Sequence, residues 1–378
     1  MKFQIQLVAV AAAVLVAACG GGSDTTAVRV VGDSLNDGGV FGFKFTVQGA
    51  ANDPQPIWAD RVTSALGAPA LCPRYAATGP STVALNPQAT SCTSYGVGGG
   101  RVNPIGAAGD ATPFSVIQQL KDMSAKSFAE NELLLADGGG NDAADLIGAY
   151  LGASADAGAA YVALLGELLT PAQVGAAVSG GAVGLAAAGG QYMVALANAL
   201  ADGIDAHALG KGAQRVVLVN APNVVKTPRF QHVLAGVAAA SGGGATGAAA
   251  ATQVAALAEG WVKAYNAQLQ ARYASQTKVA VVDFYGEFNK WLTTPASYGL
   301  TNTTTPACPV TGTDSNGLPA YTIATCTVAS LSAAPQPGTS GADWWKTYVF
   351  ADNFHGTPRT NQLMADLVLT TLSAKGWK

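Results

Sequence analysis

A strand-forming apolar run that ends in a serine constrains this chain more than any other feature. Residues 28–32 favour a β-strand, and Ser34 follows in a turn with Gly32, Asp33 and Asn36 around it. Sheets of parallel strands keep their sites at the carboxyl ends of the strands. The pattern therefore predicts that the Ser34 hydroxyl lies at such an edge, where it becomes chemically useful once a base is near.

Two distant segments supply possible partners for Ser34. Asp352 and His355 lie three residues apart near the C-terminus, and Asn141 follows three glycines that come directly after an apolar run. A serine hydroxyl is a weak nucleophile unless a base takes its proton, and an unperturbed imidazole titrates near pH ~6.5. We expect acyl transfer with Ser34 as nucleophile, His355 as base and Asp352 as the acid that orients the imidazole, while Asn141 donates to an oxyanion.

The order of these segments resembles the GDSL, or SGNH, hydrolase family, named for a Ser, a Gly, an Asn and a His from separate sequence blocks. Residues 32–35 resemble the first block and residues 94–102 the second. Residues 139–142 resemble the third block and residues 352–355 the last. The resemblance therefore covers nearly all of the chain that follows the first nineteen residues.

The family resemblance implies a fold and an oxyanion hole. The fold is a three-layer α/β/α sandwich with a doubly wound, mostly parallel, flavodoxin-like sheet, and short apolar runs that alternate with helices predict the same α/β class. The resemblance places the family's glycine at Gly98, with Gly99 as the rival. The oxyanion donors would be the backbone N–H groups of Ser34 and Gly98 and the side chain of Asn141. The spread of the blocks indicates one domain over residues 28–378.

Each of these residues also has a structural interpretation when taken alone. Ser34 could cap a helix, and Asn141 could be a turn residue. Asp352 and His355 could form a surface pair at a helix start. Their joint occurrence in the family order favours catalysis.

Other polar residues are expected to have structural roles. Asp33, Asp37 and Asp142 lie within the motifs, and we expect them to brace loops through hydrogen bonds. His207 and His232 are expected at the surface.

The first nineteen residues indicate export. Lys2 precedes an apolar core at residues 7–18, which is too short to span a membrane. Small residues then lead to Cys19, and this pattern resembles the lipobox of bacterial lipoproteins. It implies a signal peptide at residues 1–18, lipidation of Cys19, a tether at residues 19–27 and an outer-membrane location. Secretion after cleavage by an ordinary signal peptidase is the alternative.

The remaining four cysteines indicate disulfides. In an oxidising compartment, an even number of cysteines predicts pairing, and we favour Cys72 with Cys92 and Cys308 with Cys326 among the three connectivities. Each pair would close a loop rich in Pro, Thr, Ser and Gly and stabilise the fold by about 3 kcal/mol. A metal site is disfavoured because no Cys-x-x-Cys spacing occurs. We expect no metal and no cofactor.

Composition limits the partners. A net charge of -3 with 11% charged residues disfavours nucleic acid, which needs a concentrated basic surface. We expect a monomer whose membrane contact is the lipid anchor. Residues 235–251 are rich in Ala and Gly, and we interpret them as a loose insertion between helices.

The motifs do not choose a substrate, because the family includes carboxylesterases, lipases, phospholipases, acyltransferases and carbohydrate deacetylases. We expect a carboxylesterase or lipase that cleaves acyl esters through an acyl-enzyme intermediate. Residues 40–45 could line an acyl site or form a buried strand or turn. Removal of acetyl groups from a polysaccharide is an alternative, for which Trp344, Trp345 and Tyr348 would line a groove. An envelope binding lipoprotein without catalysis is an alternative of another class.

Overall fold

The computed structural model describes residues 24–50, 55–79, 81–105 and 109–378. The expected signal peptide at residues 1–18 and the expected lipidation site at Cys19 lie outside the described residues. Most of the expected tether, residues 19–27, lies outside them too.

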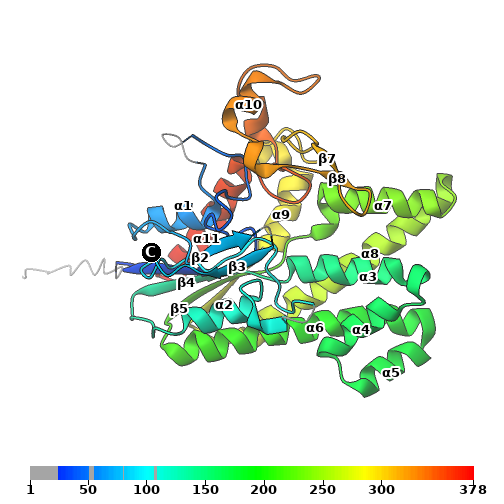
Figure 1. Ribbon diagram of the computed structural model, residues 1–378, viewed down its shortest axis with the longest axis horizontal. Coiled ribbons are helices and arrows are strands. Elements are labelled where there is room, and N and C mark those ends of the chain that lie inside the picture. The colour runs from blue at the N-terminus through cyan, green and yellow to red at the C-terminus, as the bar shows by residue number, and fades with distance from the viewer. Residues whose placement is uncertain (1–23, 51–54, 80, 106–108) are drawn as a thin grey trace, which may run out of the picture.

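A four-stranded parallel sheet lies at the centre of the molecule (Figure 1). Its strands are hydrogen-bonded in the order β1 (Ala27–Val31), β4 (Glu132–Ala136), β5 (Arg215–Val219) and β6 (Val279–Val282). Each strand is a short run rich in Val, Leu or Ala, as expected for strands that are buried on both faces. The parallel sheet predicted from the sequence is confirmed.

Helices cover both faces of the sheet and complete three layers. Successive side chains of a strand point to opposite faces. Val30 and Leu135 therefore join one core cluster, and Val31 and Leu134 join the other. The first cluster packs under α1 (Trp58–Ala65), α9 (Phe284–Thr293) and α11 (Pro358–Ala374); the second packs under α2 (Val116–Met123), α6 (Gly181–His207) and α8 (Gly244–Arg272). The expected α/β/α class is confirmed.

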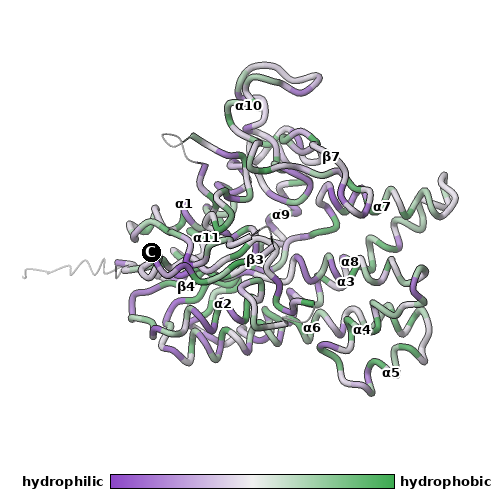
Figure 2. Tube along the Cα trace, in the orientation of Figure 1, coloured by the Kyte–Doolittle hydropathy of each residue, from purple (hydrophilic) through white to green (hydrophobic). Residues whose placement is uncertain are grey.

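The other elements surround this core. They are the helices α3 (Gly140–Asp156), α4 (Ala159–Leu168), α5 (Pro171–Ser179), α7 (Pro228–Ala240) and α10 (Val328–Ala333), and the hairpins β2 (Tyr75–Gly79) with β3 (Thr82–Leu85) and β7 (Gly312–Thr313) with β8 (Pro319–Ala320). Helices α3 and α7 extend from the sheet toward the same side of the molecule (Figure 1). Hydrophobic stretches occur along both of them (Figure 2).

The expectation of a loose insertion at residues 235–251 is wrong. Helix α7 continues to Ala240 and α8 begins at Gly244, so the chain leaves helical structure only in a short turn between them. Alanine has the highest helix propensity, and this outweighs the scattered glycines. A glycine is needed at 247, because a Cβ there would overlap the backbone of Ala238 where the two helices cross.

Both expected disulfides are present. Cys72 is bonded to Cys92, and Cys308 is bonded to Cys326. The second disulfide closes the loop that carries the β7–β8 hairpin. Each bond restrains a local loop, which is the arrangement that the spacing of the cysteines favoured.

The end of β1 generates a stability prediction. Gly32 has a φ of +145°, and a Cβ on it would overlap the Asp137 carboxylate. Gly39 has a φ of +113° with open space around it, so a substitution there measures the cost of a side chain at positive φ without any steric overlap. We expect Gly39→Ala to lower the free energy of unfolding by about 1–2 kcal/mol and Gly32→Ala to lower it by more than about 3 kcal/mol. Urea unfolding measures both, and equal losses would contradict this account.

Candidate active site

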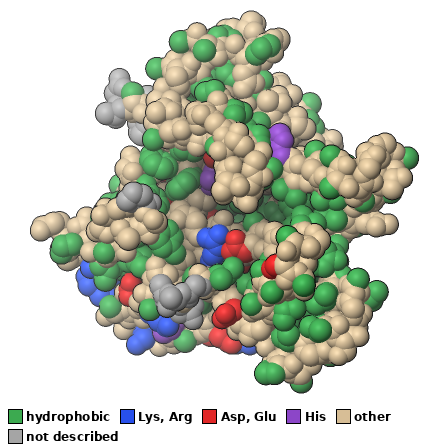
Figure 3. All heavy atoms as spheres, turned by 45° about the vertical axis from the view of Figure 1, so that its right-hand side comes forward, with side chains coloured by type: hydrophobic (Ala, Val, Ile, Leu, Met, Phe, Trp, Pro, Cys, Tyr) green, Lys and Arg blue, Asp and Glu red, His purple; other side chains and the backbone are tan. Residues whose placement is uncertain are grey.

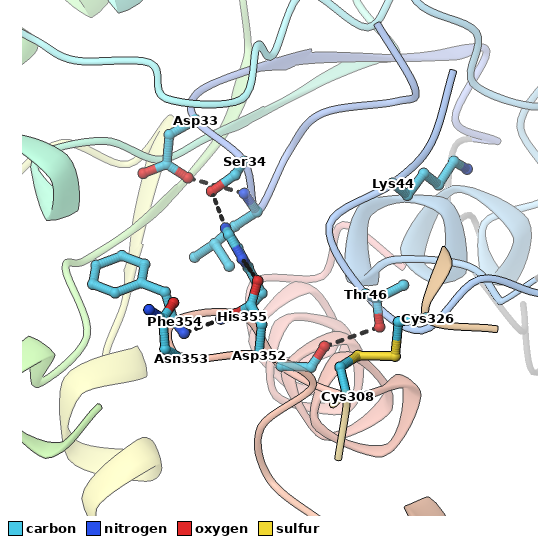
Figure 4. Close-up of polar contacts among 12 residues, drawn as sticks. Asp33, Ser34, Lys44, Thr46, Cys308, Cys326, Asp352, Asn353, Phe354 and His355 are labelled. Carbon is cyan, nitrogen blue, oxygen red and sulfur yellow. Dashed lines mark hydrogen bonds and ion pairs between the residues drawn. A yellow bond between two sulfur atoms is a disulfide. The ribbon is translucent and has the colours of Figure 1, made fainter. Parts of the chain in front are cut away.

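The structure brings Ser34, His355 and Asp352 into one chain of hydrogen bonds (Figure 4). Ser34 lies in the turn after β1, while the other two lie in the loop before α11. Ser34 Oγ is 2.7 Å from His355 Nε2, and His355 Nδ1 is 2.7 Å from Asp352 Oδ2. With the imidazole proton on Nδ1, where the carboxylate accepts it, Nε2 is left to accept the Ser34 proton.

Asp352 also shapes the loop that carries His355. Its Oδ1 accepts hydrogen bonds from the backbone N–H groups of Phe354 and His355, at 2.7 and 2.6 Å. The Thr357 side chain then accepts from the Thr360 N–H and caps α11, directly after the loop. One carboxylate therefore fixes both the backbone and the ring of His355.

The electrostatics of this pair favour its ionised form. Burial alone lowers the pKa of His355, but the charge of Asp352 and its hydrogen bond outweigh burial and raise the pKa above the usual value. Burial alone raises the pKa of Asp352, yet the imidazole and the two backbone N–H groups hold it below its usual range. The two directions agree, so Asp352 stabilises an imidazolium when His355 takes a proton.

A second carboxyl group, Asp137, supports the turn that carries Ser34. Its Oδ1 accepts from the Asp33 N–H at 3.0 Å, and Asp33 Oδ1 accepts from the Leu35 N–H at 2.9 Å. Burial raises the pKa of both carboxyls, and the charge of Asp33 adds to the effect on Asp137. Sequence reasoning missed Asp137, although this polar residue comes directly after the apolar strand β4.

Gly98 does not supply an oxyanion donor. Its N–H donates to Asp37 Oδ2 at 2.7 Å, so this group is already committed. The rival, Gly99, lines the cavity in front of Ser34, and among the described residues no acceptor faces its N–H. The Ser34 N–H likewise has no acceptor within the described parts of the chain. Asn141 lines the same cavity and donates to the Gly100 carbonyl at 3.0 Å, which leaves its second N–H available.

Asp37 and Asp142 brace the loops, as expected. Asp37 accepts from the N–H groups of Gly39, Val40 and Gly98, and Asp142 accepts from those of residues 102 and 103. Both carboxylates are buried, and burial raises the pKa of Asp142 to about 6. The turn around Gly99 is therefore held from two sides.

Phe45 explains why residue 98 is a glycine. The Phe45 ring lies 4.9 Å from the His355 ring, centroid to centroid, and a Cβ on Gly98 would overlap it. Residues 40–45 form no strand: they include a turn at residues 40 and 41, and Phe45 lines the cavity. The Phe45 ring thus packs between Gly98 and the imidazole of His355.

A cavity of about 710 Å³ opens in front of Ser34. This lies within the range of small-molecule sites, which is about 300–1,000 Å³. Figure 3 shows this face hollowed between lobes of the molecule, with hydrophobic side chains along the hollow and basic and acidic atoms side by side within it. The charged lining includes Arg101, which is paired with Asp145, and Arg229, which is paired with Asp314.

Other sequence candidates do not join this site. Trp344, Trp345 and Tyr348 are buried in a separate core cluster with the Cys308–Cys326 disulfide, so they do not line a groove. His232 is exposed, and His207 contacts Ser124 on the far helical layer. Among the described residues, no group of three or more His, Cys, Asp or Glu side chains could hold a metal ion.

Comparison with known proteins agrees with the sequence blocks. A family model described as GDSL-like Lipase/Acylhydrolase matches residues 28–368. The match begins within β1 and ends within α11, so it includes every residue of the hydrogen-bonded chain. No curated protein matches the chain.

The Asp352–His355 pair generates a titration prediction. In Asp352→Asn the charge that raises the His355 pKa is lost while burial of the ring remains. The pKa of His355 should therefore fall below its value in the unaltered protein. NMR titration of the His355 imidazole in both proteins measures this. An unchanged His355 pKa would contradict the assigned electrostatics.

Gly98 and Phe45 generate a rescue prediction. Gly98→Ala should displace the Phe45 ring from His355 and lower the free energy of unfolding by about 1–3 kcal/mol, the usual cost of overpacking. Phe45→Ala removes the clash. The double variant should therefore lose less free energy of unfolding than the two single variants lose together. Denaturant unfolding of all four proteins measures the coupling, and additive losses would show that the two residues do not meet.

Proposed function

Because this chain belongs to the GDSL-like lipase/acylhydrolase family, we propose that it is a serine hydrolase that cleaves acyl esters through an acyl-enzyme intermediate. The observation that carries the proposal is the hydrogen-bonded series from Ser34 through His355 to Asp352. It places a base within reach of the hydroxyl proton and an acid on the far side of the base.

The first half of the reaction forms the acyl-enzyme. His355 Nε2 takes the proton as Ser34 Oγ attacks the ester carbonyl carbon. The resulting oxyanion accepts from the N–H groups of Ser34 and Gly99 and from the free N–H of Asn141. The intermediate collapses with cleavage of the ester C–O bond, and the imidazolium gives its proton to the departing alkoxide.

The second half releases the acid. A water molecule takes the place of the alcohol and gives a proton to His355 as it attacks the acyl-enzyme. The second oxyanion collapses, the carboxylic acid leaves, and Ser34 recovers its proton from His355. Asp352 stays ionised throughout and stabilises the imidazolium in both halves, consistent with the lowered pKa of its carboxyl.

Two disulfides indicate an exported protein, because such bonds persist in oxidising compartments. We infer that the leader pattern at residues 1–18 directs export and that Cys19 carries the lipid anchor at the outer membrane. Residues 28–378 would then form a single catalytic domain at the cell envelope. Ordinary secretion is the alternative, and mass spectrometry of the mature N-terminus separates the two.

The competing functions have less support. The aromatic groove proposed for a polysaccharide deacetylase is absent, because Trp344, Trp345 and Tyr348 are buried. A non-catalytic binding protein has no need for an imidazole held between a hydroxyl and a carboxylate. The complete connection of Ser34 to Asp352 therefore favours an enzyme.

Hydrolysis of p-nitrophenyl acetate and butyrate tests the proposed function. We expect turnover by the purified protein and a loss of at least about 10⁴-fold in kcat in Ser34→Ala. Ser154→Ala, on the exposed surface of α3, is the matched control and should keep full activity. The kcat/KM should fall as the pH drops through an apparent pKa above 6.5, because the base must be neutral. Equal rates in Ser34→Ala would refute the assignment.

A further inference from the structure

The cavity in front of Ser34 continues as a groove along α3. Asn141, Ala144, Gly148 and Leu151 all line it. Residues three and four apart lie on one face of a helix, so these four form a single strip. Ten residues separate the first from the last in the sequence, which at 1.5 Å per residue is a length of about 15 Å.

The opposite wall of the groove is largely apolar. Its apolar residues are Phe230 and Val233 from α7, Val224 from the short 3-10 helix η3 (Val224–Lys226) and Leu318 from the β7–β8 hairpin, and its polar residues include Arg229, Asn316 and Asn353. Phe230 and Val224 are buried, as is Ile147 on the α3 side. Charged residues in the lining are neutralised in pairs, since Arg101 meets Asp145 and Arg229 meets Asp314.

The chemistry at Ser34 decides which part of an ester enters this groove. The carbonyl oxygen faces Asn141, at the start of α3, and the departing oxygen faces His355 Nε2. The remaining substituent of the carbonyl carbon is the acyl chain. The groove begins beside Ser34 and Asn141, so a chain attached to the reacting carbonyl carbon can enter it directly.

We propose that this groove binds a fatty acyl chain of about ten to twelve carbons, so that the preferred substrates are medium- to long-chain acyl esters. This rests on the proposed function of Ser34 and deepens it. An extended chain advances about 3.4 Å for each three bonds, so about 15 Å accommodates roughly a dozen bonds. Each added methylene that enters the groove should raise kcat/KM by roughly three- to fourfold.

Gly148 sets the usable length of the groove. It lies seven residues beyond Asn141 on the lining strip, about 10 Å along the helix axis. A Cβ on Gly148 meets no atom within 4 Å, so a larger side chain there has room to enter the groove. A bulky residue at 148 should therefore obstruct the distal half and leave Ser34 accessible.

The test compares p-nitrophenyl esters from acetate to palmitate, dispersed in one detergent, with the unaltered protein and Gly148→Phe. The unaltered protein should show a kcat/KM that rises to about ten to twelve carbons. In Gly148→Phe the ratio of kcat/KM for dodecanoate to that for butyrate should fall at least tenfold. Gly166→Phe on α4 is the matched control, because Gly166 is also helical, exposed and free of neighbours within 4 Å, and it should keep the original profile.

A second variant and a second substrate series make the outcome decisive. Val233→Trp obstructs the groove from the opposite wall and should lower the same ratio, which covers the case that Gly148→Phe fails to fold. Acetate esters of alcohols of increasing length test whether the groove takes the alcohol instead. The acyl assignment would be overturned if kcat/KM rises with the length of the alcohol and Gly148→Phe abolishes that rise.

The results also separate this inference from the proposed function. A preference for acetate over dodecanoate, or an unchanged ratio in both groove variants, overturns the acyl groove while Ser34-dependent acetate hydrolysis leaves the esterase function standing. Absence of Ser34-dependent hydrolysis of every ester overturns the proposed function and the groove assignment with it.

Discussion

The parallel pairing of β1 with β4 is the constraint on which the site depends. Val31 is paired with Ala136, so both strands end at the same edge of the sheet. The turn after β1 presents Ser34, and the glycines after β4 lead into α3 with Asn141 in its first turn. A shift of the register would separate these two residues, since each position along a strand is about 3.3 Å. The sheet therefore sets the distance between Ser34 and Asn141 before any loop contributes.

Buried carboxylates hold the loops in place at an electrostatic cost. Asp37 and Asp142 have few contacts with water, and burial raises the pKa of both. Backbone N–H groups offset this cost, because each carboxylate accepts two or three of them. The backbone N–H groups of these loops, which lie outside helices and strands, have the carboxylates as acceptors. The turn around Gly99 is thus held by acids that take no part in the proposed chemistry.

The sequence predicts the sheet, the disulfides and the residues that meet at Ser34, because each has a local signature: apolar runs, paired cysteines and short motifs. It favours Gly98 over Gly99 as the family's glycine, because the sequence does not show that the Gly98 N–H donates to the Asp37 carboxylate, which is distant in the chain. Asp137 escapes notice because its role exists only through its contact with Asp33, and the contact of Phe45 with His355 is likewise not visible in the sequence. The prediction for residues 235–251 is wrong because the glycines suggest that the helix ends there. In the structure two packed helices continue up to a short turn.

The disulfide of the β7–β8 loop connects the compartment of the protein to the shape of its cavity. The loop between Cys308 and Cys326 carries Leu318, which lines the groove. It reaches the catalytic loop through the Asn353 side chain, which donates to the Pro319 carbonyl at 3.0 Å. The disulfide restricts the conformations of the unfolded loop, so less conformational entropy is lost when the loop folds into this wall. The Cys308–Cys326 disulfide therefore helps to hold the wall that Leu318 contributes to the cavity.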